Sequence, residues 1–545
     1  MRRSEAESTA RSSATVAVWT IVSRGTGMLR VLVVGALLGP TYFANVFQAG
    51  YMLPNTVFAV VAGPVLGMIV VPAVVRAVAL GGVGRAGEVL GRVAGRLLTV
   101  AAVGSALTAL AAPLLAWTLT FGVPEPDTGK AWLLCTVLIL FVAPQVLIYT
   151  VVQLGVAAQQ GRHRFALAAG APAVESIGTI LTVAVTAAVY GVGLDVAQVP
   201  MSMAILLGVG TTASVVVHAA LQCYGAARAG VPVIPRRGWR DDPEAGDTLG
   251  RMVRSVPVAG APALVDYGLS VVASTVPGGV LVVQLSYQVF SALAFAGSRA
   301  VSMAALPGLA AAVSVGDPRR FASAWRTGVF YALVAGLPLA LLLAVFAQPT
   351  ADLLANGALR QDALIAQVAM CMVVAAFAQL ANGIHDLSRQ ALFARFDSRG
   401  PNVASIVGLL VSAVAAAGTL LLPADGTRLA GLVLALLAGE VASAVSAVLR
   451  LRVAIRPEPM LDRRHLVTLV AAVAPMLPVT AAGWWLIEVY APSRTLELPL
   501  LLSFGVLALV PYTLVLLRRE FRAAADSGVD TRADTRADTR AGTSP

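Results

Sequence analysis

The chain is dominated by long apolar segments, each at least as long as the roughly 20 residues that a helix needs to cross a bilayer. Only 12% of its 545 residues are charged, against about 25% in soluble proteins. We therefore predict an all-α polytopic membrane protein with fourteen transmembrane helices. Glycine, proline and charged interruptions place the spans at 14–38, 45–75, 97–121, 131–156, 165–191, 199–227, 255–275, 278–312, 327–348, 362–388, 401–423, 429–449, 466–488 and 496–517.

The loop charges predict the topology. An even number of spans puts both termini on one side, and the loops of that side contain 32 Lys and Arg residues, whereas the opposite loops contain 4. Because cytoplasmic loops are enriched in Lys and Arg, both termini are expected in the cytoplasm. The formal net charge of +11 is thereby explained as a topology signal, and we expect no nucleic-acid partner.

An internal repeat predicts two lobes. QQGRHRF, ending at Phe165, matches QALFARF, ending at Phe396, at an offset of 231 residues, which equals six spans. An even number of spans preserves orientation, so the lobes would be related by a pseudo-two-fold axis along the membrane normal. The predicted organisation is a cytoplasmic N-terminus (1–13), an N-lobe of six spans (14–228), a cytoplasmic linker (229–254), a C-lobe of six spans (255–450), two C-terminal helices (464–518) and a cytoplasmic tail (519–545). The tail contains the repeat DTRADTRADTRA, which cannot bury a core, so we expect it to be disordered.

Three arginines fall inside predicted spans: Arg24 and Arg30 in the first and Arg299 in the eighth. A guanidinium keeps its proton in proteins, and on insertion scales each such charge costs roughly 2.5–3.5 kcal/mol near a helix centre. There are two alternatives. Each arginine extends its charged end to the membrane surface or pairs with an acidic residue, or the arginines line an anion-binding cavity between the lobes. We favour the cavity, since the planar donor fork of arginine suits a diphosphate.

Membrane carboxylates are the second group of candidates. Glu175, Asp266 and Glu440 each lie in an apolar span. They serve either as helix-to-helix hydrogen-bond partners or as sites of ion or proton coupling, because a carboxylate in lipid must titrate or hold a cation. We interpret His218 and His385 as interface hydrogen-bonding residues rather than proton relays. No cysteine spacing indicates a disulfide or a metal site, and no motif indicates ATP hydrolysis or acyl chemistry.

Three motifs resemble those of one family. Ser23-Arg24, followed by Gly27 and Arg30, resembles the SRxxGxxR of the first span in MurJ/MviN lipid II flippases, members of the superfamily that also holds polysaccharide flippases and multidrug antiporters. Leu53-Pro54-Asn55 resembles the family's LPN in the second span. The ARxDxRxP of the family matches a set of residues between spans ten and eleven: Ala394, Arg395, Asp397, Arg399 and Pro401.

The resemblance implies a central cavity that opens alternately to each face and carries a lipid-linked disaccharide-peptide, with its diphosphate held by arginines. Arg24 and Arg30 match two of the family's cavity arginines, and we add Arg299 to the substrate-binding candidates. Asn45 stands where the family has an acidic residue and Gln288 stands in place of its span-eight arginine, so both join that set.

We therefore expect a transporter and not an enzyme: a multi-pass flippase of the bacterial cytoplasmic membrane that serves peptidoglycan biosynthesis, cell-wall biogenesis and cell shape. It would move a polyprenyl-diphosphate-linked saccharide of the lipid II type from the cytoplasmic to the outer leaflet by alternating access. The alternatives are a flippase for another lipid-linked polysaccharide unit, a cation-coupled small-molecule exporter, and a transport-inactive scaffold for envelope assembly. Cell-wall synthesis proteins are the expected partners. No cofactor is expected beyond a coupling cation of unknown identity, and the oligomeric state is left open.

Overall fold

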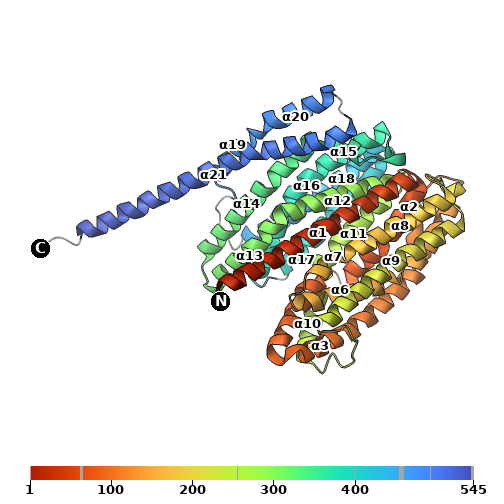
Figure 1. The fold of residues 1–545 in the computed structure, drawn as a ribbon, viewed down its shortest axis with the longest axis horizontal. Helices are drawn as coiled ribbons and strands as arrows, with labels where there is room; N and C mark the ends of the chain where they lie inside the picture. The colour runs from red at the N-terminus through yellow and green to blue at the C-terminus, as the bar shows by residue number, and fades with distance from the viewer. Residues whose placement is uncertain are drawn as a thin grey trace.

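The computed structural model describes residues 2–61, 65–254, 256–397, 399–452, 460–490 and 493–541. Within those ranges the regular structure is all helical, as predicted, and most helices run side by side along one bundle (Figure 1). The helices are α1 (Arg2–Leu38), α2 (Tyr42–Val61), α3 (Val65–Leu110), α4 (Ala112–Thr120), α5 (Thr128–Val142), α6 (Gln145–Gly161), α7 (Ala166–Gly170), α8 (Pro172–Tyr190), α9 (Met201–Arg228), α10 (Pro243–Arg254), α11 (Val256–Ala273), α12 (Gly279–Ala296), α13 (Ser298–Ser314), α14 (Pro318–Val345), α15 (Ala347–Leu354), α16 (Asp362–Ala394), α17 (Arg399–Gly418), α18 (Gly426–Arg452), α19 (Arg463–Val473), α20 (Met476–Tyr490) and α21 (Arg494–Ala541).

The bundle is built for a membrane. In the part of the chain that the structure describes, eleven helical segments are long and apolar enough to cross a bilayer, and three shorter apolar helices accompany them. Large apolar side chains face outward along the helices, including Leu80, Leu110 and Val414. Apolar surface on this scale is stable against lipid and not against water. The prediction of an all-helical polytopic membrane protein is therefore confirmed.

The second predicted span is long and bent. Pro54 lies inside α2 and Pro72 inside α3, and proline removes a hydrogen bond from a helix interior. α3 then reverses at Gly81 and Gly82, where Gly82 has a φ of 73°, a conformation that glycine adopts without steric cost. α3 therefore consists of two legs joined at this turn.

The buried apolar residues show how two helix groups meet. The first group is α1–α9 and the second is α11–α18. One large cluster draws on both groups at the end of the bundle that contains the α1–α2 and α11–α12 connections, which we call the far end. At the opposite end, which contains α10 and which we call the linker end, each group has its own cluster, one around α3 and one around α16. Among the residues that the structure describes, the groups thus share a core only at the far end.

The linker between the groups is docked on α3. Gly91 and Gly95 form a strip on α3 that the linker backbone approaches closely. A Cβ added at Gly91 would lie 2.6 Å from the carbonyl oxygen of Ile234, and one added at Gly95 would clash with that of Arg236. The backbone N–H of Arg236 also donates to the carbonyl oxygen of Gly91 at 2.8 Å. Beyond this strip, α10 buries Ala245, Leu249 and Met252 in the same apolar cluster as α3.

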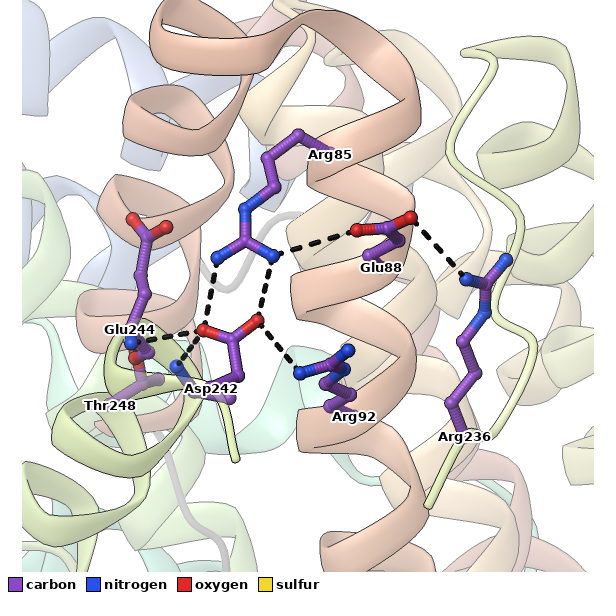
Figure 2. A network of polar contacts seen from close by, with 8 residues as sticks. Arg85, Glu88, Arg92, Arg236, Asp242, Glu244 and Thr248 are labelled. Carbon is purple, nitrogen blue, oxygen red and sulfur yellow. Dashed lines mark hydrogen bonds and ion pairs between the residues drawn. The ribbon is translucent and has the colours of Figure 1, made fainter. Parts of the chain in front are cut away.

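Asp242 anchors the start of α10 (Figure 2). Its side chain is 1% exposed and its carboxylate lies 2.8 Å from Arg85 and 3.4 Å from Arg92 of α3. It also accepts the backbone N–H groups of Glu244 and Ala245, which caps the helix. Burial opposes ionisation, but these hydrogen bonds and the Arg85 charge outweigh it and hold the pKa of Asp242 below its ordinary value. The start of α10 is therefore bound to α3 of the first helix group.

The C-terminal tail differs from the prediction. α21 continues to Ala541 and leaves the bundle as one long helix (Figure 1), so residues 519–541, expected to be disordered, are helical. A helix that is already formed can be extended without a new nucleation cost, and the sequence has no proline between Pro511 and Ala541 to stop it. The composition of the tail shows only that it cannot bury a core, and an extending helix does not need to bury one.

Candidate functional site

Arg24 projects from α1 toward the second helix group. Its Nη1 donates to Ser291 Oγ at 3.2 Å, and its guanidinium carbon lies 4.4 Å from the ring centroid of Phe295, both on α12. Arg24 is half-buried and Arg299 of α13 is exposed. Arg299 lies in the first turn of α13, four residues after Phe295. Gln288 lies three residues before Ser291 on α12 and is half-buried, so it belongs to the same helix face.

Arg30 points into the first helix group instead. Its Nη1 donates to the Tyr51 hydroxyl at 2.6 Å and the guanidinium carbon lies 4.9 Å from the Tyr51 ring centroid. Tyr51 in turn donates to Glu175 Oε1 at 3.3 Å, and Tyr149 donates to the same oxygen at 2.7 Å. Helices α1, α2, α6 and α8 therefore meet at one buried carboxylate. Arg30 is linked to an acidic residue, one of the two alternatives that the sequence left open.

The other oxygen of Glu175 contacts a histidine. His218 Nδ1 of α9 lies 2.8 Å from Glu175 Oε2. His218 Nε2 lies 3.3 Å from Gln222 Nε2, and Gln222 Oε1 accepts from Gln159 Nε2 at 2.6 Å. No pattern in the sequence connects these residues to Glu175. The one available signal is that His218 and Gln222 are four residues apart, which puts them on one face of a helix.

The carboxylates of the second helix group lie in separate surroundings. Asp266 of α11 accepts from Gln284 Nε2 of α12 at 3.1 Å. Glu440 of α18 accepts from Asn382 Nδ2 at 3.0 Å and lies 3.4 Å from His385 Nδ1, both on α16. Glu440 and His385 also line a cavity of about 50 Å³ between α11, α16, α17 and α18, a volume that can hold a water molecule.

Asn45 lies away from the arginines. It is 1% exposed at the far end, where its Nδ2 donates to the carbonyl oxygens of Val276 at 2.7 Å and Ser274 at 3.4 Å. Its Oδ1 accepts the backbone N–H of Val280 at 3.0 Å. Both polar atoms of the amide thus bind the α11–α12 connection. In this structure Asn45 therefore joins the two helix groups, and its expected role in binding substrate stays a prediction.

The third motif forms a turn between α16 and α17. Asp397 Oδ1 accepts the backbone N–H groups of Arg399 and Gly400, and Asp397 Oδ2 accepts from Arg450 Nε at 2.7 Å. Arg395 lies over the ring of Phe321, with 5.6 Å between its guanidinium carbon and the ring centroid. Pro401 is buried in the first turn of α17. These contacts join the turn between α16 and α17 to α14 and α18.

The residues of the other two motifs lie on α1 and α2. Ser23 accepts a hydrogen bond from Thr26 through its carbonyl oxygen. At Gly27 an added Cβ would meet only Ser176 Oγ, at 4.0 Å, so the α1 backbone between the two arginines is open. Pro54 lies inside α2 and Asn55 is exposed beside it. Among the residues that the structure describes, no group of three or more His, Cys, Asp or Glu side chains could hold a metal ion.

Comparison with known proteins adds a family and a fold. A family model described as lipid II flippase MurJ matches residues 34–504. A solved structure of lipid II flippase MurJ in an inward closed conformation superposes with a TM-score of 0.67 at 14% identity, over 93% of this chain and 99% of that one.

Two further structures show the same fold. An inward-facing multidrug resistance MATE family transporter of the MOP superfamily matches with a TM-score of 0.60 at 15% identity, over 80% of this chain and 94% of that one. A MOP superfamily transporter from Pyrococcus furiosus matches with a TM-score of 0.55 at 16% identity, over 82% of this chain and 95% of that one.

Proposed function

Because the chain belongs to the lipid II flippase MurJ family, we propose that Arg24, Arg30 and Arg299 receive the diphosphate of the lipid-linked peptidoglycan precursor that this protein flips. Membership of the family makes the chain a membrane transporter and not an enzyme. The substrate class is a polyprenyl-diphosphate-linked saccharide of the lipid II type, carried from the cytoplasmic to the outer leaflet of the bacterial inner membrane.

The observation that carries the site proposal is the contact of Arg24 with Ser291 and Phe295 of the second helix group, shortly before Arg299 in the chain. An anion bound between guanidinium groups of like charge is stabilised by both of them. The contacts of Arg24 with the Ser291 hydroxyl and the Phe295 ring leave its charge uncancelled. Gln288, on the same face of α12 as Ser291, is placed to add an amide donor. A diphosphate matches this arrangement in charge and in hydrogen-bond acceptors.

We propose fourteen spans in two lobes, with α1–α9 as the N-lobe, residues 229–254 as the linker, α11–α18 as the C-lobe and α19–α21 as the terminal pair. The reversal of α3 at Gly81 and Gly82 supports counting its legs separately. α6 and α16 end in similar turns, with positive φ at His163 and Phe396, which supports the pseudo-two-fold repeat. The excess of basic residues in the loops at the linker end supports a cytoplasmic location for both termini.

The core arrangement supports alternating access. A core shared at the far end and divided at the linker end is the pattern expected of lobes that are closed toward the outside and separable toward the cytoplasm. The hydrogen bonds of Asn45 with Val276 and Val280 at the α11–α12 connection join the two groups and hold the far end closed. Outward opening then requires these contacts to break.

In this proposal the membrane potential provides energy for transport. At about 2.3 kcal/mol per charge per 100 mV, moving an anionic head group out of a negative cytoplasm is favoured by the potential. Glu175, Asp266 and Glu440 are proposed sites of ion or proton coupling, supported by their polar partners, with Glu175 buried and the other two half-buried. Cell-wall synthesis proteins are the proposed partners.

The test is complementation of a strain depleted of its own lipid II flippase, with lipid II on the cell surface measured in parallel. Growth with surface-exposed lipid II is expected. Arg24→Ala and Arg30→Ala should abolish both while the protein still inserts in the membrane. Absence of rescue by the folded, membrane-inserted wild type would contradict the assignment of lipid II as the substrate.

A further inference from the structure

A buried polar chain continues inward from Arg30 beyond anything that diphosphate binding requires. It passes through Tyr51 to Glu175 and on to His218, Gln222 and Gln159. Glu175 is 8% exposed and His218 is 4% exposed. Burying ionisable groups is costly unless they are paired and hydrogen-bonded. A chain of this length, drawn from five helices, therefore needs a role of its own.

The amide contacts indicate which nitrogen of His218 accepts a hydrogen bond. Gln159 Nε2 lies near three acceptors, the carbonyl oxygens of Gly155 and Gln222 at 3.2 Å and Gln222 Oε1 at 2.6 Å. That arrangement directs the Gln222 amide nitrogen toward His218 Nε2. An amide nitrogen can only donate, so with Gln222 in this orientation His218 Nε2 accepts. The matching tautomer carries its proton on Nδ1 and donates it to Glu175.

In this state the charges of the chain cancel, because one carboxylate faces one guanidinium. The other titratable groups that face the pair are Tyr51 of α2 and Tyr149 of α6, both donors to Glu175. α7 consists of Ala, Leu and Gly residues, and Lys130 of α5 is bound to the carbonyl oxygen of Ala197 instead. A proton added at His218 Nε2 therefore changes the net charge of the cluster from zero to +1, once the Gln222 amide rotates to accept it and the Gln159 amide rotates to accept from Gln222 Nε2.

We propose that Glu175 and His218 form a proton-binding site that sets the affinity of Arg30 for the diphosphate of the substrate. This inference rests on the function proposed above. While His218 is neutral, the Glu175 carboxylate holds Arg30 through Tyr51. When His218 is protonated, the imidazolium neutralises that carboxylate and the Arg30 charge is available to an anion. By linkage, binding of the diphosphate draws a proton onto His218. His218 is thus more than the interface hydrogen-bonding residue expected from the sequence.

The experiment measures the affinity of the purified full chain for lipid II in lipid nanodiscs between about pH 5 and pH 8, the range in which an imidazole changes its charge. Wild type should bind about five- to tenfold more tightly at the acidic end, a coupling of ordinary size. His218→Gln keeps an amide donor for Glu175 but cannot take up the proton, so it should bind weakly at every pH. Glu175→Gln removes the charge that holds Arg30, so it should bind tightly even at the alkaline end.

The matched control is His163→Asn. It removes an imidazole from an exposed turn with a φ of 56°, a conformation that asparagine tolerates, and it should keep the wild-type pH dependence. Opposite effects of His218→Gln and Glu175→Gln support the proposal, because a merely structural role would weaken binding in both. A pH dependence in His218→Gln equal to that of wild type overturns the proton site and leaves the flippase function intact.

The two proposals can fail separately. If wild type binds no lipid II at any pH, the proposed substrate is wrong, and inorganic pyrophosphate becomes the probe. Thermal stabilisation of wild type by pyrophosphate that grows toward acidic pH, and that His218→Gln abolishes, still supports the proton site. Equal pH dependence of this stabilisation in wild type and His218→Gln overturns it.

Discussion

Replacing Asn45 by alanine should open the far end of the bundle. The side chain makes three hydrogen bonds across the lobes, to Val276, Ser274 and Val280, at 2.7, 3.4 and 3.0 Å. In Asn45→Ala the Val280 N–H loses its side-chain acceptor in a buried place, at roughly 1–3 kcal/mol, whereas the Val276 carbonyl keeps the N–H of Gly279 at 2.9 Å. The Val280 N–H reaches water when the far end opens, so the cost falls on the closed state alone.

A shift of about 1–3 kcal/mol toward the open state corresponds to a change of about 5- to 150-fold in the equilibrium between the closed and open far end, which we call the gate. Asn45→Asp should act in the same direction, since a carboxylate still accepts from Val280 but cannot donate to the two carbonyl oxygens. The assay uses a chain without its native cysteines that carries Ser274→Cys. Ser274 is 1% exposed while the gate is closed. A membrane-impermeant maleimide added from outside should label the Asn45→Ala protein much faster than the parent protein.

Asn402→Ala is the matched control for this assay. Asn402 donates to the carbonyl oxygen of Arg254 at 3.1 Å, a contact between α17 and α10 at the linker end. Its loss should leave labelling of Ser274→Cys unchanged. Labelling that is equally slow in Asn45→Ala and in the parent protein would refute the reasoning that the Asn45 amide holds the gate.

The remaining predictions concern the cytoplasmic turns and the packing of the C-lobe. Asp242→Asn keeps the cap of α10 but removes its charge. The free energy of opening of α10, measured by amide hydrogen exchange, should fall by about 1–2 kcal/mol, a modest value because Arg85 and Arg92 are partly exposed. Since the Asp242 pKa is lowered by folding, wild type should keep this stabilisation above about pH 4 and lose it as the pH falls through the lowered pKa, whereas Asp242→Asn should show no such loss. Asp397→Ala removes the cap of α17 and the bond to Arg450 and should lower the melting temperature, with Asp397→Asn retaining the cap and most of the stability. Gly408→Ala should destabilise α17 against α18, because its Cβ would lie 2.9 Å from the carbonyl oxygen of Gly439, whereas Gly418→Ala on the same helix meets nothing within 4 Å and should be neutral.

The sequence predicts the all-helical membrane class well, because long apolar segments indicate both their length and their environment. The membrane arginines were also found from the sequence, since a charge among apolar residues stands out without any knowledge of its partners. The role of Asn45 could not be predicted in this way. Its partners are backbone groups about 230 residues away, and backbone groups leave no mark in the residue pattern.

The buried chain behind Arg30 was also out of reach of the sequence. Tyr51, Glu175 and His218 come from three different helices, and only packing brings them to one carboxylate. For the same reason the sequence alone does not decide whether Arg30 pairs with an acidic residue or lines a cavity. The structure shows Arg30 linked to Glu175 through Tyr51 and Arg24 facing a hydroxyl and an aromatic ring.

The most direct test of the central claim is the rate of lipid II flipping in proteoliposomes that contain wild type, Arg24→Ala, Arg30→Ala or the control Arg360→Ala, which removes an exposed charge from the far end. If the arginines hold the diphosphate, wild type and Arg360→Ala should flip lipid II, while Arg24→Ala and Arg30→Ala should approach the rate of empty liposomes. Flipping at the wild-type rate by both Arg24→Ala and Arg30→Ala would contradict the account.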